Sequence, residues 1–408
     1  MNILQVHKYL KIEGGADVVM FETARFLKKR GHHVAFFGMN HPANEVTGQE
    51  PYWVDYIDYH APMSAWRKAR LALKSVYSAE AATKMRRLLR DLPQDVAHLH
   101  NYHHQLTPSV LGPLKAAGVP MVWTLHDFQL ICPNYLLFDP HRLEICEECK
   151  GGHYFNATCK RCLKGSLLQS FLASLEAHAH RLLNTYGRAI DCFIPPSRFL
   201  AEKIVEHGIP RDRVTQIPNP QSLDGCAPQE KDGYILYFGR LDREKGVLTL
   251  LKAMERRRDL ELRMAGRGRD EALCRRYAEE HRLDNVKFLG FMRDGLKDLI
   301  ARARFTIIPS EWYENYPLAV LESHACGTAT LGAEIGGIPE LIAAGVDGMT
   351  FRSGDVGHLM ERIDALCAKS NAELREMGMA GREKVARENN EDLYIERLEG
   401  VYRRVMRK

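Results

Sequence analysis

The sequence lacks the long apolar runs that would cross a membrane, since none approaches the roughly 18 residues of a spanning helix. Its first residues, MNILQVHKYLKIEGG, also lack the basic segment and apolar stretch that are typical of a secretory signal. No internal repeat or low-complexity segment stands out. These absences favour an ordinary globular protein, which we expect in the cytoplasm or at the inner face of the plasma membrane.

A strong charge of either sign is absent as well. The 57 lysines and arginines and 52 carboxylates leave a formal net charge of +5. Such weak basicity suits phosphate-bearing partners but does not indicate nucleic acid binding. The 408 residues exceed what a single hydrophobic core usually serves, so we expect two domains.

Ten cysteines without an export signal predict a reducing compartment rather than a disulfide framework. Four of them form two CxxC pairs, namely Cys146, Cys149, Cys159 and Cys162. Two such pairs suit tetrahedral zinc, although the nine residues between them are fewer than is usual. We favour a structural zinc that clips a long loop, with an iron–sulfur cluster or unligated thiols as alternatives.

The chain begins with two short apolar runs on either side of an amphipathic helical segment. Residues 2–7 and 33–38 are expected to be buried strands, and the helix between them ends at Gly31. Such βαβ units predict a parallel sheet with right-handed crossovers. Gly14 and Gly15 are not a complete dinucleotide fingerprint, so a nicotinamide cofactor is not indicated. They suit either a tight turn or a backbone that approaches a phosphate.

Residues 63–92 form a basic helical region in which eight lysines and arginines face only Glu80 and Asp91. Such a region could lie on an anionic membrane surface. A solvated helix packed on a sheet explains the pattern equally well. Further along, a strand at 119–126 ends in His126-Asp127, where parallel sheets place functional groups. A helical region then runs from about residue 167 to residue 186.

Residues 221–233 are polar, contain Gly and Pro, and read as a linker between two α/β units. We expect a first domain at 1–220 with a cysteine-rich insert at 132–165, and a second domain at 230–387. The C-terminal helix, at about 388–408, is expected to pack back near the first domain.

Two parallel-sheet domains predict a cleft between the carboxyl ends of their strands. The second domain would place in it Arg240, Lys245, Gly266, Gly268, Glu314 and Glu322. The cations and a helix N-terminus suit a diphosphate, and a carboxylate suits a pair of vicinal hydroxyls. The set therefore predicts a nucleotide diphosphate that carries sugar-like groups at both ends.

Two carboxylates, Glu314 and Glu322, are separated by seven residues. Pro317 suits the first turn of a helix and Gly327 the residue after its end, so Glu314 lies on the preceding loop. The alternative interpretation is a general acid and base, as in glycoside hydrolysis. We weigh against it because the helix dipole should keep Glu322 ionised and a diphosphate leaving group needs positive charge.

These motifs together resemble glycosyltransferase family 4, which has the GT-B fold. The matching pieces are Gly14-Gly15, His126-Asp127, PSRF at 196–199, IPNP at 217–220, FGRLDREKG, AGRG, NVKFLGF, and E-x7-E followed by IGGIPE. They span nearly the whole chain in the family's order. A cysteine-rich insert also occurs in some bacterial members that build surface polysaccharides. In relatives a glycine often follows the asparagine equivalent to Asn219, whereas Pro220 follows here, so the role of Asn219 is left in doubt.

The resemblance implies two Rossmann-like α/β domains and a retaining hexosyl transfer from a nucleotide-diphosphate sugar, with no catalytic metal. The acceptor would be a saccharide or a polyprenyl-linked saccharide. The implied catalytic residues are Glu314, His126, Arg240 and Lys245. The implied donor contacts are Gly15, Arg240, Lys245, Gly266, Gly290, Phe291, Asn315, Tyr316, Pro317, Leu318 and Glu322. Two other classes stay open: a nucleotide-sugar epimerase of similar fold and a non-catalytic nucleotide-sugar-binding protein.

Overall fold

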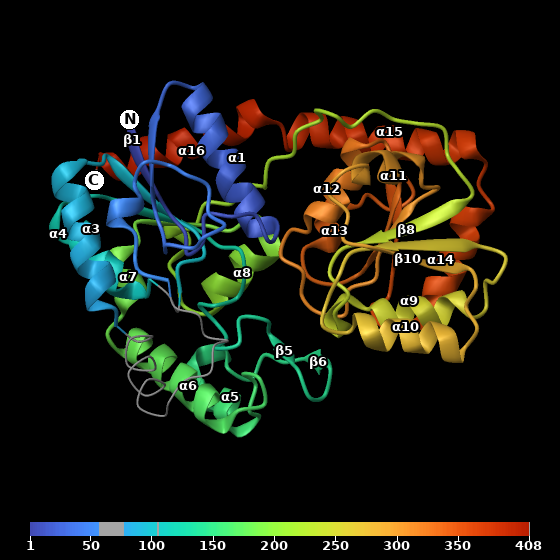
Figure 1. The fold of residues 1–408 in the computed structure, drawn as a ribbon, viewed down its shortest axis with the longest axis horizontal. Helices are drawn as coiled ribbons and strands as arrows, with labels where there is room; N and C mark the ends of the chain where they lie inside the picture. Colours follow the sequence, from blue (N-terminus) through green and yellow to red (C-terminus); the bar gives the residue numbers. More distant parts are fainter. Residues whose placement is uncertain (57–76, 104–105, 408) are drawn as a thin grey trace.

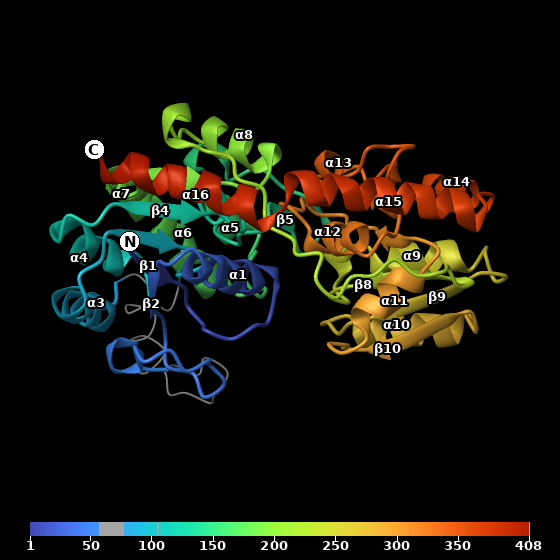
Figure 2. The same cartoon turned by 90° about the horizontal axis from the view of Figure 1, so that it is seen from above.

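The computed structural model describes residues 1–56, 77–103 and 106–407 and has two halves, each built around a parallel β-sheet (Figure 1; Figure 2). The first sheet has the order β2-β1-β3-β4-β7, with β1 (Asn2–Val6), β2 (His33–Phe37), β3 (Val96–Leu99), β4 (Met121–Thr124) and β7 (Cys192–Ile194). The second has the order β10-β9-β8-β11-β12-β13, with β8 (Tyr234–Phe238), β9 (Glu261–Ala265), β10 (Val286–Gly290), β11 (Thr306–Ile308), β12 (Thr330–Ala333) and β13 (Gly348–Phe351). The predicted α/β architecture of two parallel sheets is confirmed.

Helices pack against the sheets and explain why strands such as NILQV and YILYF are almost entirely buried. The first half contains α1 (Gly15–Lys29), α3 (Ala79–Asp91), α4 (Leu111–Ala116), α5 (Phe155–Cys159), α6 (Leu167–Leu182), α7 (Thr185–Ala189) and α8 (Arg198–Glu206). The chain continues with α9 (Val247–Met254), α10 (Glu271–Glu280), α11 (Leu296–Arg302), α12 (Leu318–Ala325), α13 (Ile338–Leu341), α14 (Val356–Cys367), α15 (Asn371–Glu388) and α16 (Glu391–Met406). Of the described helices, none combines the length and apolar character needed to cross a membrane.

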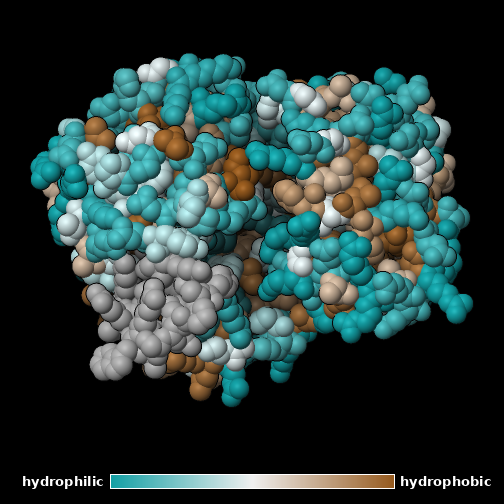
Figure 3. Space-filling view, viewed as in Figure 1, coloured by the Kyte–Doolittle hydropathy of each residue, from teal (hydrophilic) through white to brown (hydrophobic). Residues whose placement is uncertain are grey.

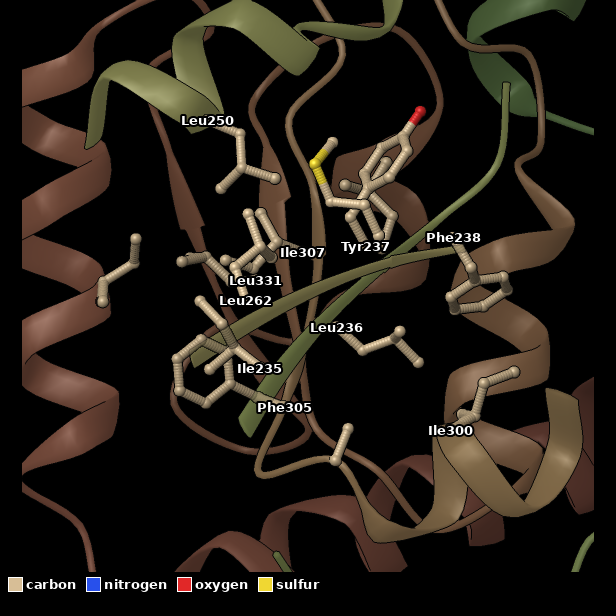
Figure 4. Close-up of a cluster of buried hydrophobic side chains, with 14 of the residues drawn as sticks. Ile235, Leu236, Tyr237, Phe238, Leu250, Leu262, Ile300, Phe305, Ile307 and Leu331 are labelled. Atoms are coloured by element: carbon tan, nitrogen blue, oxygen red, sulfur yellow. The ribbon is translucent and has the colours of Figure 1, made fainter. Parts of the chain in front are cut away.

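The core of the second half is built from neighbouring strands (Figure 4). Ile235 of β8, Leu262 of β9, Ile307 of β11 and Leu331 of β12 are at most 1% exposed. Because these strands are parallel and buried on both faces, their carboxyl ends meet at one edge of the sheet. That edge is where the loops with the predicted site residues begin.

The two C-terminal helices connect the halves. In Figure 1, α15 runs along the second half and α16 continues along the first. Tyr394, Leu398 and Tyr402 of α16 are buried in a cluster with Ile3 and Val122 of the first sheet. The hydroxyl of Tyr402 also lies 2.7 Å from Nδ1 of His98. The end of the chain is therefore part of the first half's core.

Only part of the basic region at 63–92 can be assessed, because residues 57–76 lie outside the described residues. Its described helix, α3, buries Ala81, Met85 and Leu88 against the first half. Lys84 is bonded to the carboxylate of Asp55 at 2.8 Å. For α3, the structure favours a packed, solvated helix over one whose apolar face lies in a membrane.

The cysteine-rich insert follows β4 and contains a two-stranded hairpin, β5 (Phe138–Asp139) and β6 (Glu144–Ile145). The predicted zinc ligands were Cys146, Cys149, Cys159 and Cys162. Within the described ranges, no group of three or more His, Cys, Asp or Glu is arranged to hold a metal ion, so the structure does not support this site. Cys159 is exposed, whereas Cys149 is buried and interacts with the thiol of Cys132, which lowers the pKa of Cys132. Cys132 lies outside the CxxC pattern, so the spacing alone could not reveal this pairing.

Candidate active site

Four neighbouring strands of the second sheet deliver most of the predicted site residues. Arg240 follows β8, Gly266 follows β9, Gly290 ends β10, and the loop with Glu314 follows β11. The order β10-β9-β8-β11 places these four strand ends side by side. In Figure 3 the surface is hollowed between the two halves of the molecule. The predicted collection of cations, glycine loops and a carboxylate at one sheet edge therefore corresponds to adjacent strands.

Glu314 is buried and holds three donors on one oxygen. Its Oε1 accepts hydrogen bonds from Lys245 Nζ at 2.7 Å, Ser310 Oγ at 2.6 Å and Trp312 Nε1 at 3.0 Å. Burial raises the pKa of Glu314, but the charge of Lys245 and these hydrogen bonds outweigh it and leave the pKa below its ordinary value. Glu314 is thus a carboxylate at neutral pH.

Arg240 is half-exposed and is paired with carboxylates of its own loop. Its Nη1 lies 2.5 Å from Asp242 Oδ2, and its Nη2 lies 3.7 Å from Glu244 Oε1. Arg269 contacts the same two carboxylates, with Nη2 2.7 Å from Glu244 Oε1. An anionic ligand that bound Arg240 would therefore have to compete with Asp242.

Two glycines let the loops approach one another closely. Gly246 has φ +69°, and a Cβ there would lie 1.8 Å from the carbonyl oxygen of Pro309. Gly266 has φ +146°, and a Cβ there would lie 1.8 Å from the carbonyl oxygen of Gly239. Because Lys245 directly precedes Gly246, the tight approach to the β11 loop is what brings Lys245 to Glu314.

Two helix N-termini meet across the gap between the halves. Helix α1 begins at Gly15 and α12 begins at Leu318. A Cβ on Gly15 would lie 3.2 Å from Leu318 Cδ1. The turn before α1 is fixed by Asp17, whose Oδ2 accepts from the backbone N–H groups of Glu13 and Gly14, both at 2.8 Å. Free N–H groups at both helix starts suit an anion between them.

A pocket of about 310 Å³ adjoins these helix starts. It is lined by Val18, Val19, Glu22, Arg25, Pro220, Gln221, Ser222, Asp224, Lys297, Leu318 and Glu322. Burial, aided by the nearby Cys226, raises the pKa of Glu322 to about 7. The expectation that the helix dipole keeps Glu322 ionised is therefore wrong. Its side chain lies in the second turn of α12, beyond the range where the dipole is strong.

His126 comes from the first half and lies at the end of a histidine chain. Gln5 Oε1 is 2.8 Å from His100 Nε2, and His100 Nδ1 is 2.9 Å from His126 Nε2. With the Gln5 amide in this orientation its carbonyl oxygen can only accept, which assigns the His100 proton to Nε2 and lets His100 Nδ1 accept from His126 Nε2–H. His126 Nδ1 is then an unprotonated acceptor. Burial lowers the pKa of His126 to about 3 and that of His100 well below its usual value, so both rings are neutral.

The loop with Glu314 is held against the strand end that leads to His126. Asn315 Nδ2 donates to the carbonyl oxygen of Leu125 at 3.0 Å. Asn315 Oδ1 accepts from Ser197 Oγ at 2.8 Å. Since Asn315 follows Glu314 and Leu125 precedes His126, these bonds bring the two predicted residues to the same gap.

Glu340 is not among the predicted site residues, yet it caps a helix of the opposite half. Its carboxylate accepts from the backbone N–H groups of Arg198 and Phe199, at 2.8 and 2.7 Å. The PSRF motif supplies the N-cap Ser197 of α8, and IGGIPE supplies Glu340. The serine in PSRF predicts the start of a helix. The sequence does not indicate that Glu340, in the other half, binds the first amides of that helix.

The other predicted donor contacts surround this region. Gly290 has φ +71° at the end of β10, and the following Phe291 is 69% exposed. Tyr316 accepts a hydrogen bond from Asn389 Nδ2 at 3.0 Å, and burial raises its pKa to about 12. Asn389 also donates to the carbonyl oxygen of Asn219 at 2.8 Å. The buried Asn219 therefore helps to anchor the start of the linker.

Comparison with known proteins agrees with these motifs over nearly the whole chain. Residues 13–224 match the model described as Glycosyltransferase Family 4, and residues 224–384 match Glycosyl transferases group 1. An uncharacterised glycosyltransferase of Methanocaldococcus jannaschii is 32% identical over 368 residues, covering 83% of this chain and 81% of that protein. N-acetyl-alpha-D-glucosaminyl L-malate synthase of Bacillus anthracis is 28% identical over 411 residues, covering 97% of this chain and 95% of the relative.

A solved structure has the same arrangement of two sheets. Anabaena HepE in complex with UDP-glucose superposes with a TM-score of 0.67 and 15% identity, covering 98% of this chain and 99% of its own. The resemblance seen in the motifs is thus confirmed by sequence over both halves and by fold. The chain belongs to glycosyltransferase family 4 and has the GT-B fold.

Proposed function

We propose that the protein transfers a sugar, with retention of anomeric configuration, from a nucleotide-diphosphate donor to a hydroxyl of a saccharide or lipid-linked saccharide. The observation that carries the proposal is the ion pair of Lys245 with the buried Glu314. The loop of Glu314 is bonded through Asn315 to the strand end that leads to His126. Similarity to HepE in complex with UDP-glucose and to the GlcNAc-malate synthase supports a nucleotide-sugar donor. Some bacterial members with a cysteine-rich insert build surface polysaccharides, which supports a saccharide acceptor in such a pathway.

The donor diphosphate would bind where the cations and helix starts converge. On donor binding, Lys245 would exchange its ion pair with Glu314 for one with the diphosphate. Arg240 would likewise exchange Asp242 for the diphosphate. Both side chains are already within reach of carboxylates, so an anion offers them an equivalent partner. Released from Lys245, the carboxylate of Glu314 accepts hydrogen bonds from hydroxyls of the transferred sugar. Glu322 accepts from the ribose hydroxyls in the adjoining pocket.

In the transfer step, the bond from the anomeric carbon to the phosphate oxygen breaks while the bond to the acceptor oxygen forms on the same face. The acceptor proton goes to the departing diphosphate. Lys245, Arg240 and the N–H groups of α1 and α12 stabilise the negative charge that develops there. His126 is neutral, so it orients a sugar hydroxyl through Nδ1 rather than donating a proton.

In the same proposal, the two halves of the molecule bind different substrates. Residues 1–220 would hold the acceptor, and residues 230–387 would hold the donor. The site is expected on the cytoplasmic side of the membrane. Gly290 and Phe291 would lie near the base, and Gly15 would approach the phosphates when donor occupies the cleft.

The test is replacement of Glu314 by Gln, which keeps the shape of the side chain but removes its charge. We expect release of nucleotide diphosphate from the active donor to fall by about a hundredfold or more. The donor is first found by screening pooled nucleotide sugars. The matched control is Glu334→Gln, because Glu334 is an exposed carboxylate of the same half, bonded to Thr350 at 2.7 Å.

Wild-type rates in Glu314→Gln, with an unchanged melting temperature, would contradict the assignment. Product analysis in the absence of any acceptor separates the competing classes. An epimerase would convert the donor under those conditions, whereas a binding protein would show calorimetric donor binding without turnover across an acceptor panel.

A further inference from the structure

Helix α6 is amphipathic, but it buries its polar face and exposes its apolar face. The buried residues are Ser170, Ser174, Glu176 and His180. The exposed apolar residues are Leu167, Leu168, Phe171, Leu175 and Leu182, which are between 42% and 87% exposed. A surface helix normally has the opposite arrangement.

The exposed residues lie on one face of the helix, which we call the α6 stripe (Leu167, Leu168, Phe171, Leu175 and Leu182). At about 100° per residue, their positions fall within roughly 100° of the helix circumference. Phe155 of α5 is also exposed and extends the stripe, with its ring centroid 6.2 Å from that of Phe171. Hydrophobic surface is visible at the lower edge of Figure 3, where Figure 1 places α5 and α6.

Hydrogen bonds fix the rotation of α6 about its axis, so the stripe cannot turn inward. Ser174 Oγ donates to the carbonyl oxygen of Tyr154 at 2.7 Å and accepts from Thr158 Oγ1 at 2.8 Å. Ser170 Oγ accepts from the backbone N–H of Leu163 at 3.0 Å. Turning the stripe toward the core would break these bonds and bury their partners unpaired.

Positive charge flanks the α6 stripe at both ends. Arg161 and Lys164 precede it and Arg188 follows it, and all three are exposed. Arg181 lies toward the buried side of the helix instead, with Nη1 3.3 Å from His207 Nε2. Residues 159–190 contain five lysines and arginines but a single carboxylate, Glu176. That carboxylate is buried on the opposite face, where burial raises its pKa to about 7.

We infer that the α6 stripe lies in the surface of a membrane that contains anionic lipid. The leucines and Phe171 would enter the acyl boundary while the flanking cations contact the headgroups. A second copy of the chain is a poorer occupant, because parallel or antiparallel pairing of two stripes brings like-charged ends together. Helix α3, whose apolar residues are buried, offers no comparable face.

This surface has a direct link to the candidate site. The insert between β4 and α6 carries Glu147, and burial together with a hydrogen bond to Glu147 raises the pKa of Tyr313 to about 12. Tyr313 directly precedes Glu314. Docking through α6 would therefore bring the insert, and with it the Glu314 loop that the insert contacts, close to the bilayer. This consequence rests on the proposed function, whereas the docking itself does not.

The test is co-sedimentation of the full-length protein with phosphatidylcholine vesicles that contain about one-third phosphatidylglycerol. We expect salt-sensitive binding by the wild type and a loss of about tenfold or more in the double variant Leu168→Ser/Leu175→Ser. The matched control is Leu92→Ser/Val346→Ser, which replaces two exposed apolar residues elsewhere and should bind as the wild type does.

An unchanged circular dichroism melt shows that the double variant is folded, and nucleotide-diphosphate release measured in detergent-free solution reports the proposed function separately. Failure of the wild type to bind the vesicles would overturn the inference, as would equal binding by wild type and double variant. So would light scattering that shows a dimer for the wild type and a monomer for the double variant, because a second copy would then cover the stripe.

Discussion

His126 depends on its neighbours for the position of its proton. The chain from Gln5 through His100 leaves Nδ1 of His126 free to accept, and the low pKa of the ring keeps it neutral over the physiological range. A neutral acceptor recognises a hydroxyl but cannot supply charge to the leaving group. At this site, positive charge comes from Lys245 and Arg240 instead.

Replacement of His100 by Phe removes the acceptor that fixes this tautomer. We expect kcat/KM to fall by about fivefold to tenfold, corresponding to one hydrogen bond of ~1 kcal/mol. Nitrogen-15 NMR of the wild type should show His126 protonated on Nε2. The control is His141→Phe at an exposed histidine of the insert. A wild-type His126 protonated on Nδ1 would contradict the proton assignment, because it would reverse every donor in the chain.

Glu322 should make donor binding depend on pH. In the proposed donor complex its carboxylate form accepts from both ribose hydroxyls. Because the pKa is about 7, this form becomes dominant as pH rises through neutrality. Affinity for the nucleoside diphosphate of the donor found in the screen should therefore increase by up to about tenfold between about pH 6 and about pH 8. The control is calorimetric titration of the Glu322→Gln variant over the same pH range. The variant lacks the carboxylate, so its remaining pH dependence comes from the phosphates of the ligand. If wild type and variant have the same pH profile, Glu322 does not contact the nucleotide as an ionised group.

At the scale of elements, the alternation of apolar runs and amphipathic segments was enough to predict the two parallel sheets. The same pattern placed Arg240 and Glu314 after strands. It could not show why Gly246 is needed, because the obstructing carbonyl belongs to Pro309, far away in the sequence. The ion pair of Lys245 with Glu314 depends on the close approach of Gly246 to Pro309, so the sequence pattern could not predict it either.

Helices α3 and α6 show a second limit of sequence patterns. Both carry apolar residues at helical spacing, which normally marks a core face. In α3 that face is buried, whereas in α6 the polar face is held inward by hydrogen bonds from the cysteine-rich insert. The cysteines show the same limit of sequence patterns. The CxxC spacing predicted zinc, whereas the buried Cys149 interacts with Cys132, which lies outside both CxxC pairs. Such outcomes depend on tertiary contacts.

At the scale of the whole molecule, the halves are joined by a small number of polar contacts near the candidate site. Asn315 binds the ends of β4 and α8, and α16 packs into the first half's core. The sequence could not reveal these contacts, since each joins residues more than a hundred positions apart. They hold Glu314 and His126 on opposite walls of one gap.

Glu340 offers the sharpest test of this arrangement. Its carboxylate accepts from two N–H groups at the N-terminus of α8, where the helix dipole strengthens the interaction. Replacement by Gln removes the charge and should weaken the contact by about 1–2 kcal/mol. The amides of Arg198 and Phe199 should then exchange with deuterium about tenfold faster, and the KM for donor should rise because the arrangement in which Glu340 contacts α8 is less populated. Glu334→Gln is again the matched control. Unchanged exchange at both amides would mean that Glu340 does not hold the halves together in solution.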